Sequence, residues 1–177
     1  MKTGEKLFRA IMKLVMNGEF VYVMTQNFGS LSNKRTRMFV SALIEKRQQN
    51  KYVCVVMRNN LPFRFNILNY KVARTLIENN INVYVNPKIH SKLVITDYGV
   101  YVGSANISGR MNSMYEIGTI ITDAHEVSSY YAYFNRIIAD PKTKKVTQTN
   151  INELFKLHTD KKSEIDFAWD ERIYVIF

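Results

Sequence analysis

Residues 89–97 read Ile-His-Ser-Lys-Leu-Val-Ile-Thr-Asp, and residues 103–106 read Gly-Ser-Ala-Asn. The first stretch has the apolar character of a β-strand, so we expect a strand over residues 90–96. Residues two apart on a strand point to the same face, which places His90 and Lys92 together. The residues expected on the opposite, packed face are Leu93 and Ile95.

This pairing of side chains suits chemistry at a phosphate group. A neutral imidazole such as that of His90 is a good nucleophile or proton carrier near neutral pH. The ammonium of Lys92 would hold a phosphate oxygen as negative charge develops there. A turn at residues 97–99 would fold the next strand back, so that Ser104 and Asn106 supply a hydroxyl and an amide donor to the remaining phosphate oxygens.

The complete pattern is His-x-Lys, four residues, Asp, and later Gly-Ser-x-Asn, and it resembles the HKD motif of the phospholipase D superfamily. The resemblance covers residues 89–106 directly. The order of strands and helices over residues 20–138 is also similar to that family. It implies an α/β fold in which a mixed β-sheet is sandwiched between α-helices. The length of 177 residues fits one such domain over residues 1–177.

The resemblance also implies a reaction and its residues. Family members cleave phosphodiesters without a metal ion or other cofactor, through a phosphohistidine intermediate. His90 would be the nucleophile, and Lys92, Ser104 and Asn106 would bind phosphate. The family's downstream carboxylate, which holds the other histidine nitrogen, corresponds to Glu116. The structural positions of the motif are Asp97, expected to order the turn, and Gly103.

The sequence contains one His-x-Lys, because His125 and His158 lack a lysine two residues later. Members with two motifs fold them into one site, whereas short single-motif nucleases of the family dimerise to bring two motifs together. The resemblance therefore implies a homodimer with a shared active site.

The charge distribution favours a polyanionic partner. The sequence has 25 Lys and Arg against 15 Asp and Glu, which gives a formal net charge of +10. Such a protein is drawn to nucleic acid, or to an anionic membrane surface as the alternative. We therefore expect a nuclease acting on DNA or RNA. Two alternatives stay open: a phospholipid-acting phosphodiesterase or phosphatidyl transferase, and a nucleic-acid-binding module without catalysis.

The apolar segments and the cysteine content indicate a cytoplasmic protein. Cys54 is the only cysteine and lies in an apolar run, where it is expected to be buried. No cluster of residues has metal-ligand spacing. No apolar stretch has the length of a signal sequence or a membrane span, so we expect no stable membrane insertion.

Elsewhere, hydrophobic periodicity and capping residues predict the remaining elements. Helices are expected over residues 1–17, from a cap at Ser32 or Asn33 to about Arg47, around residues 72–77, after Asp123, and over 151–157. Strands are expected over 20–24, 53–57, 83–85, 100–102, 117–121 and 173–177, and an exposed basic loop over 142–145. In the second helix, Met38, Phe39, Ala42 and Leu43 are expected to face inward.

Two further groups could contact a nucleic acid. The basic residues Lys34, Arg35 and Arg37 lie at an expected helix start, where they form either a substrate-facing loop or a solvated helix face. The tyrosines Tyr98 and Tyr101 lie near the expected turn and could stack on bases, although nothing in the sequence selects them over core aromatics.

Overall fold

One mixed β-sheet organises the fold. A computed structural model describes residues 4–58, 67–106 and 116–152. Its strands are β1 Phe20–Thr25, β2 Tyr52–Arg58, β3 Asn82–Asn86, β4 Leu93–Thr96, β5 Gly99–Gly103, β6 Gly118–Ile121 and β7 Lys144–Lys145. Its labelled helices are α1 Gly4–Asn17, α2 Lys34–Gln48, α3 Ile67–Glu78 and α4 Ala124–Ala139, and a further helical segment covers residues 148–152.

The strands follow the order β6-β5-β4-β1-β2-β3-β7. The central strands β1, β2 and β3 run parallel, with Val23 opposite Val55 and Val55 opposite Val83. The strands β4, β5 and β6 continue the sheet as antiparallel hairpins on one side, and β7 adds antiparallel to β3 on the other. Parallel neighbours need crossover helices, which α2 and α3 supply.

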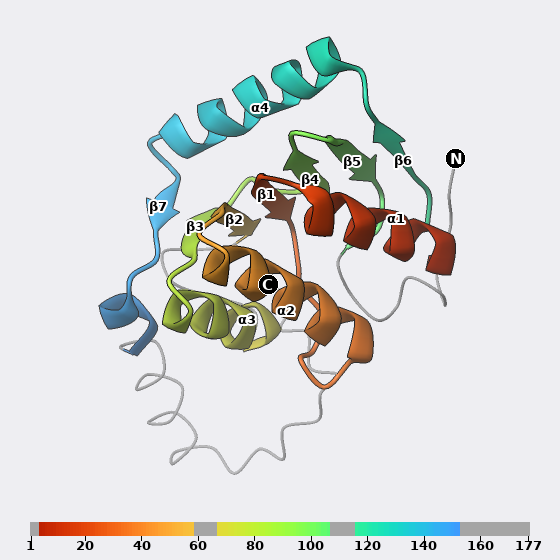
Figure 1. Cartoon of the computed structure of the whole chain (residues 1–177). Helices are drawn as coiled ribbons and strands as arrows, with labels where there is room; N and C mark the ends of the chain where they lie inside the picture. The colour runs from red at the N-terminus through yellow and green to blue at the C-terminus, as the bar shows by residue number, and fades with distance from the viewer. Residues whose placement is uncertain (1–3, 59–66, 107–115, 153–177) are drawn as a thin grey trace.

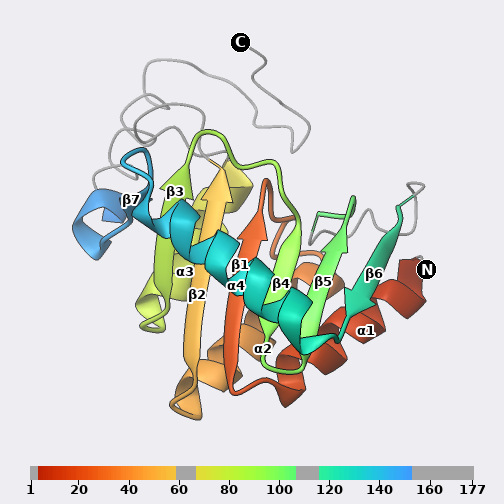
Figure 2. The same cartoon turned by 90° about the horizontal axis from the view of Figure 1, so that it is seen from above.

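Helices cover both faces of the sheet, as the sequence predicted. Figure 1 shows α1, α2 and α3 grouped on one face and α4 alone on the other, and Figure 2 shows α4 crossing the sheet diagonally. Each face has its own buried cluster, one under α1 to α3 and one under α4. In β2, Val55 packs into the first cluster and Val56 into the second, which explains its unbroken apolar run. Cys54 is buried and free, and burial raises the pKa of its thiol to about 12.

Helix α1 falls within the helix expected over residues 1–17, and the residues of its apolar face are all buried. They are Leu7, Phe8, Ile11, Leu14 and Val15. Helix α2 begins after Asn33, whose side-chain oxygen accepts hydrogen bonds from the backbone N–H groups of Arg35 (3.0 Å) and Thr36 (3.4 Å). Helix α4 begins after Asp123, whose carboxylate likewise caps the N–H groups of His125 and Glu126.

Three expectations for single elements are wrong. Met38 is 43% exposed, because the buried stripe of α2 runs through Phe39, Ala42 and Leu43 and leaves Met38 about a quarter-turn away. The basic segment over residues 142–145 contains strand β7 at its end. The last described helix begins at residue 148 rather than 151.

The expected strand over residues 173–177 lies outside the described residues. Among the helices of the described residues, none is long and apolar enough to cross a membrane.

Candidate active site

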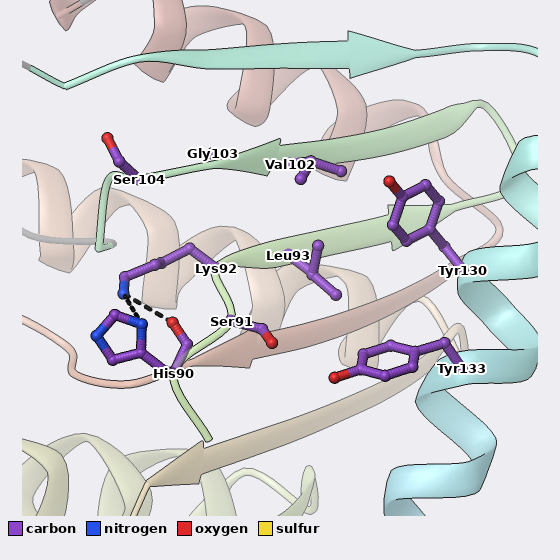
Figure 3. A pocket seen from close by; sticks show the side chains of 9 residues that line it. All are labelled: His90, Ser91, Lys92, Leu93, Val102, Gly103, Ser104, Tyr130 and Tyr133. Atoms are coloured by element: carbon purple, nitrogen blue, oxygen red, sulfur yellow. Dashed lines mark hydrogen bonds between the residues drawn. The ribbon is translucent and has the colours of Figure 1, made fainter. Parts of the chain in front are cut away.

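His90 and Lys92 lie on the connection between β3 and β4, just before β4 begins. The prediction of a strand is wrong for residues 90–92. The pairing between β1 and β4 ends at the pair formed by Met24 and Leu93, so β4 begins at Leu93. The two side chains nevertheless meet. The Lys92 ammonium donates to the His90 backbone oxygen (2.7 Å) and lies 3.4 Å from His90 Nδ1 (Figure 3). Leu93 and Ile95 pack together under α4, as expected.

The environments of the two residues differ. The His90 side chain is exposed, whereas Lys92 is only 8% exposed. Burial lowers the pKa of the Lys92 amine, the nearby Glu116 carboxylate opposes that shift, and the Arg58 guanidinium adds to it. A cation with so little water around it interacts strongly with any anion that enters the site.

The hairpin of β4 and β5 brings Ser104 to the same end of the sheet. Leu93 pairs with Val102, and the Gly103 N–H donates to the Lys92 carbonyl (3.3 Å). The Ser104 hydroxyl donates to the Glu116 carboxylate and accepts from the Ile117 N–H (3.1 Å). Ser104 is therefore exposed but held between β5 and the start of β6.

Gly103 has a steric role in this arrangement. A Cβ atom at this position would lie 2.5 Å from the Tyr101 hydroxyl and 2.7 Å from the Ile117 carbonyl. The Tyr101 ring is fully buried, and its hydroxyl donates to the Ala105 carbonyl (3.2 Å), so neither neighbour has room to move. A larger residue at Gly103 would displace the backbone that carries Ser104.

Asn106 lies beside the end of β1. Its side-chain oxygen accepts a hydrogen bond from the buried Thr25 hydroxyl at 3.5 Å. Asn106 itself is half-buried. The amide nitrogen of Asn106 is the donor that a bound phosphate oxygen would need.

Asp97 lies at the opposite end of β4 from His90, in the turn before β5. Its carboxylate accepts a hydrogen bond from the Glu19 N–H at 2.7 Å, which ties the hairpin to the connection between α1 and β1. Asp97 thus orders the hairpin, and its position in the turn keeps it away from His90.

A pocket of about 440 Å³ opens beside these residues. The motif residues His90, Lys92 and Ser104 line one part of it, and Tyr130 and Tyr133 of α4 line another (Figure 3). The pocket thus joins a polar, cationic region to an aromatic one. Within residues 4–58, 67–106 and 116–152, no group of three or more His, Cys, Asp and Glu side chains is placed to hold a metal ion.

A family model described as "Cardiolipin synthase, PLD-like domain" matches residues 3–138, which is most of the chain. The chain belongs to the phospholipase D superfamily. This membership confirms the resemblance on which the motif was interpreted, and it places the chain in a family of phosphodiesterase-type enzymes. No curated protein sequence matches the chain.

Solved structures of the superfamily and beyond share the fold. The phospholipase D family member Nuc from Salmonella typhimurium superimposes with a TM-score of 0.64 at 11% identity, over 79% of this chain and 90% of that chain. Polyphosphate kinase from Porphyromonas gingivalis gives 0.60 at 17% identity, over 76% of this chain and 24% of that one. The archaeal chromatin protein TrmBL2, described with a novel mode of DNA binding, gives 0.55 at 15% identity, over 82% and 52%.

Sequence reasoning missed two residues that shape this phospholipase D-like site. Gln26 directly follows β1, and its side-chain oxygen lies 3.4 Å from the Lys92 ammonium. Asn69 of α3 is fully buried; it accepts from the Phe28 N–H (2.7 Å) and donates to the Gln26 carbonyl (3.1 Å). Polar residues that follow a central strand are a signal that could have found Gln26, because strand ends line such sites. Asn69 has no comparable local signal.

Glu116 and two of the basic residues at the start of α2 make contacts that the sequence did not predict. The Glu116 carboxylate accepts a hydrogen bond from the Ser104 hydroxyl, and its expected contact with a ring nitrogen of His90 stays a prediction. Of the basic residues at the start of α2, Arg35 forms an ion pair with Glu5 (2.5 Å), and its guanidinium lies over the Phe8 ring. The Arg37 guanidinium donates to the carbonyls of Leu31 and Ser32. These contacts explain the two arginines as parts of the helix surface.

Proposed function

We propose that the chain is a metal-independent phosphodiesterase that cleaves DNA or RNA through a phosphohistidine at His90. The observation that carries the proposal is the desolvated Lys92 ammonium, held 3.4 Å from His90 Nδ1 beside a pocket. An exposed imidazole next to a buried cation is suited to attack on a bound phosphodiester, because the cation stabilises the charge that builds up on the phosphate oxygens.

Phosphate binding is assigned to three side chains. Lys92 supplies the charge, and Ser104 and Asn106 supply a hydroxyl and an amide donor from the β5 end of the sheet. Because Ser104 and Lys92 line the same pocket, one phosphate group could contact both. Binding there would place the phosphorus atom next to the exposed ring of His90.

The proposed role of Glu116 follows from where the protons go during the reaction. Attack by His90 Nε2 forms the N–P bond and breaks the P–O bond to the leaving alcohol, which takes a proton from a second histidine. Attack through Nε2 requires the tautomer with the proton on Nδ1, so the Lys92 ammonium, 3.4 Å from Nδ1 in this structure, would turn to the substrate phosphate. Glu116 is the carboxylate proposed to accept the hydrogen bond from Nδ1–H in its place. The second histidine, now neutral, takes a proton from a water molecule that attacks phosphorus. The N–P bond breaks, His90 is regenerated, and the second histidine is protonated again.

The second histidine is proposed to be His90 of another copy of the chain, since the sequence contains one His-x-Lys. A two-fold homodimer would place both histidines at one shared site. The proposal includes one domain over residues 1–177 and a reducing, cytoplasmic setting, with which the free and buried Cys54 is compatible.

Nucleic acid is favoured as the substrate by charge. The formal net charge of +10 attracts polyanions, and phosphate contacts dominate nucleic-acid binding. The fold of Nuc and of the DNA-binding TrmBL2 is compatible with this choice. A lipid-acting phosphodiesterase or phosphatidyl transferase is the second candidate, because the matching family model is described by cardiolipin synthase.

The test compares substrates in excess EDTA. Single-stranded and double-stranded DNA and RNA are incubated with the protein, alongside phosphatidylglycerol vesicles. We expect cleavage of nucleic acid in EDTA, its abolition in His90→Ala, and its retention in His125→Ala, which alters an exposed histidine in the first turn of α4.

Each other outcome rejects part of the proposal. Activity that vanishes in EDTA and returns with a divalent cation would reject metal independence. Near-normal turnover by His90→Ala would reject the nucleophile. Turnover of vesicles alone would select the lipid candidate, and tight binding of nucleic acid without cleavage of any substrate would select the binding module.

A further inference from the structure

The pocket beside His90 has an aromatic region that the proposed phosphate chemistry does not use. Tyr130 and Tyr133 lie three residues apart on α4, on the helix side that faces the sheet, and both side chains are half-buried. Figure 3 shows both rings projecting from α4 into the pocket, on the other side of it from His90 and Lys92. Across from them, Leu93 and Val102 form part of the pocket wall.

Neither tyrosine fills the core under α4. Phe134 does so, since it is fully buried, whereas Tyr130 and Tyr133 pack at the margin of the same cluster. Neither hydroxyl has a hydrogen-bond partner among the described residues. The two side chains therefore offer aromatic ring surface and free hydroxyl groups to a ligand in the pocket. This combination suits a planar ligand with polar edges.

A cation lies against one of the two rings. The exposed Arg136 guanidinium is 5.8 Å from the centre of the Tyr133 ring. The pocket thus combines a cationic phosphate site with an aromatic surface, and a further cation lies against one of the rings. Cations beside an aromatic surface suit a nucleotide strand, in which phosphates and bases alternate.

We infer that Tyr130 and Tyr133 form a stacking platform for the base of the nucleotide that carries the scissile phosphate, an inference that rests on the proposed nuclease function. A volume of about 440 Å³ lies in the range of small-ligand sites, roughly 300–1,000 Å³. Stacking tolerates every base, because each base has a π-face, so the platform confers little base preference.

The proposed platform also indicates whether the substrate is single-stranded or double-stranded. A base that inserts between the tyrosines and the wall of Leu93 and Val102 has left the stack of a duplex. Unstacking costs free energy in double-stranded nucleic acid and little in a single strand. The pocket therefore takes a nucleotide with an unstacked base, and single strands are the better substrates.

The experiment uses a dinucleoside monophosphate, whose single phosphodiester defines the cleavage point, and an analogue in which hydrogen replaces both bases. We expect the full-length wild-type protein to cleave the natural compound with a kcat/KM at least about fivefold higher, the size of a base–aromatic stacking effect. In Tyr133→Leu and Tyr130→Leu this ratio falls towards one. In Tyr133→Phe it is kept, because the ring remains.

The control is Tyr98→Leu, which removes a tyrosine that is 56% exposed in the turn at the far end of β4. Its ratio equals that of the wild type. A wild-type ratio near one overturns the platform whatever the variants do, and so does a ratio that Tyr133→Leu and Tyr130→Leu leave unchanged. Duplex cleavage faster than cleavage of the matching single strand likewise overturns it.

Failure of the underlying function has a different signature. If the wild type cleaves neither dinucleotide nor longer nucleic acid but hydrolyses phosphatidylglycerol vesicles, the nuclease proposal falls and the platform falls with it. If longer nucleic acid is cleaved while the base-free analogue performs equally well, the nuclease proposal stands and the platform alone is rejected.

Discussion

Lys92 combines burial with a positive charge, and the two requirements oppose each other. The residue is 8% exposed, and its ammonium makes hydrogen bonds to His90 and Gln26, which carry no negative charge. Removing an ammonium from water is unfavourable unless a counter-charge is close. The nearby Glu116 carboxylate offsets this cost only in part, because the pKa of Lys92 stays below its usual value. A bound anionic ligand would offset the rest.

The first prediction follows from that conflict. Lys92→Met keeps the chain length and removes the charge, so the unfolding free energy should rise by about 1 kcal/mol at neutral pH. Phosphodiesterase kcat/KM should fall by about a hundredfold or more, since the charge acts on the transition state. Urea unfolding and single-substrate kinetics measure the two effects.

Lys46 provides the matched control. It is 4% exposed, but its ammonium donates to the Met16 carbonyl at 2.9 Å, at the end of α1. Lys46→Met should therefore lower the unfolding free energy by about 1–3 kcal/mol and leave kcat/KM unchanged. A Lys92→Met protein that is both less stable and fully active would contradict the interpretation of Lys92.

The lowered pKa of Lys92 also sets a pH dependence. In the unfolded chain the amine keeps its proton up to about pH 10.4. In the folded chain it loses the proton at lower pH, so the cost of burying the charge is fully present below the folded pKa. That cost disappears as the pH rises towards the unfolded value. The stability gain of Lys92→Met should therefore shrink in this alkaline window, while wild-type activity falls.

At the scale of the elements, local signals were sufficient for the helices and insufficient for the site. Helix α1 and the caps Asn33 and Asp123 depend on residues a few positions apart, which a sequence displays. The start of β4 depends on where β1 stops pairing, and no local pattern in residues 90–92 records this. The motif residues were nevertheless brought together, because the hairpin register follows from its short turn.

The aromatic wall shows a second limit of sequence reasoning. Tyr130, Tyr133 and Phe134 share a helical spacing that is typical of core residues. Only the packing of α4 on the sheet separates the buried Phe134 from the half-buried tyrosines. The two tyrosines near the turn, which the sequence offered as candidates for base stacking, do not line the pocket. Tyr101 is fully buried, and Tyr98 is exposed in the turn after β4, far from His90.

Asn69 couples three elements to the site and carries the next prediction. It links α3 to the segment after β1 and, at 3.4 Å, to the Arg58 carbonyl at the end of β2. Asn69→Ala leaves the buried Phe28 N–H without its acceptor, which should lower the unfolding free energy by about 1–3 kcal/mol. The freed segment carries Gln26, so kcat/KM should fall several-fold as Lys92 loses a fixed neighbour.

Asn79→Ala is the control, because Asn79 donates to the Thr75 carbonyl (2.8 Å) after the end of α3, away from the pocket. Its kcat/KM should equal the wild-type value. If Asn69→Ala loses stability but retains full kcat/KM at a temperature where it is folded, the segment after β1 does not position Lys92.

On the scale of the whole molecule, the sequence contains one His-x-Lys, whereas the proposed chemistry uses a nucleophile and a separate proton donor. His90 is exposed at one end of the sheet, where a second copy could approach it. A closed two-fold dimer places the same surface of both chains at its axis. A site assembled there needs no second motif in the chain.

Subunit mixing tests this arrangement. When equal amounts of wild-type and His90→Ala chains exchange fully, about a quarter of the dimers carry both histidines. Turnover should then fall to about a quarter of that of the same total amount of wild type, whereas independent sites would retain about half. Mixing with His125→Ala controls for the exchange procedure and should retain full activity, and differently tagged chains verify that exchange is complete. The shared site is rejected if turnover stays near half after verified exchange, or if sedimentation at the assay concentration shows a fully active monomer. Either result would still leave the roles of His90 and Lys92 within one chain to the tests described above.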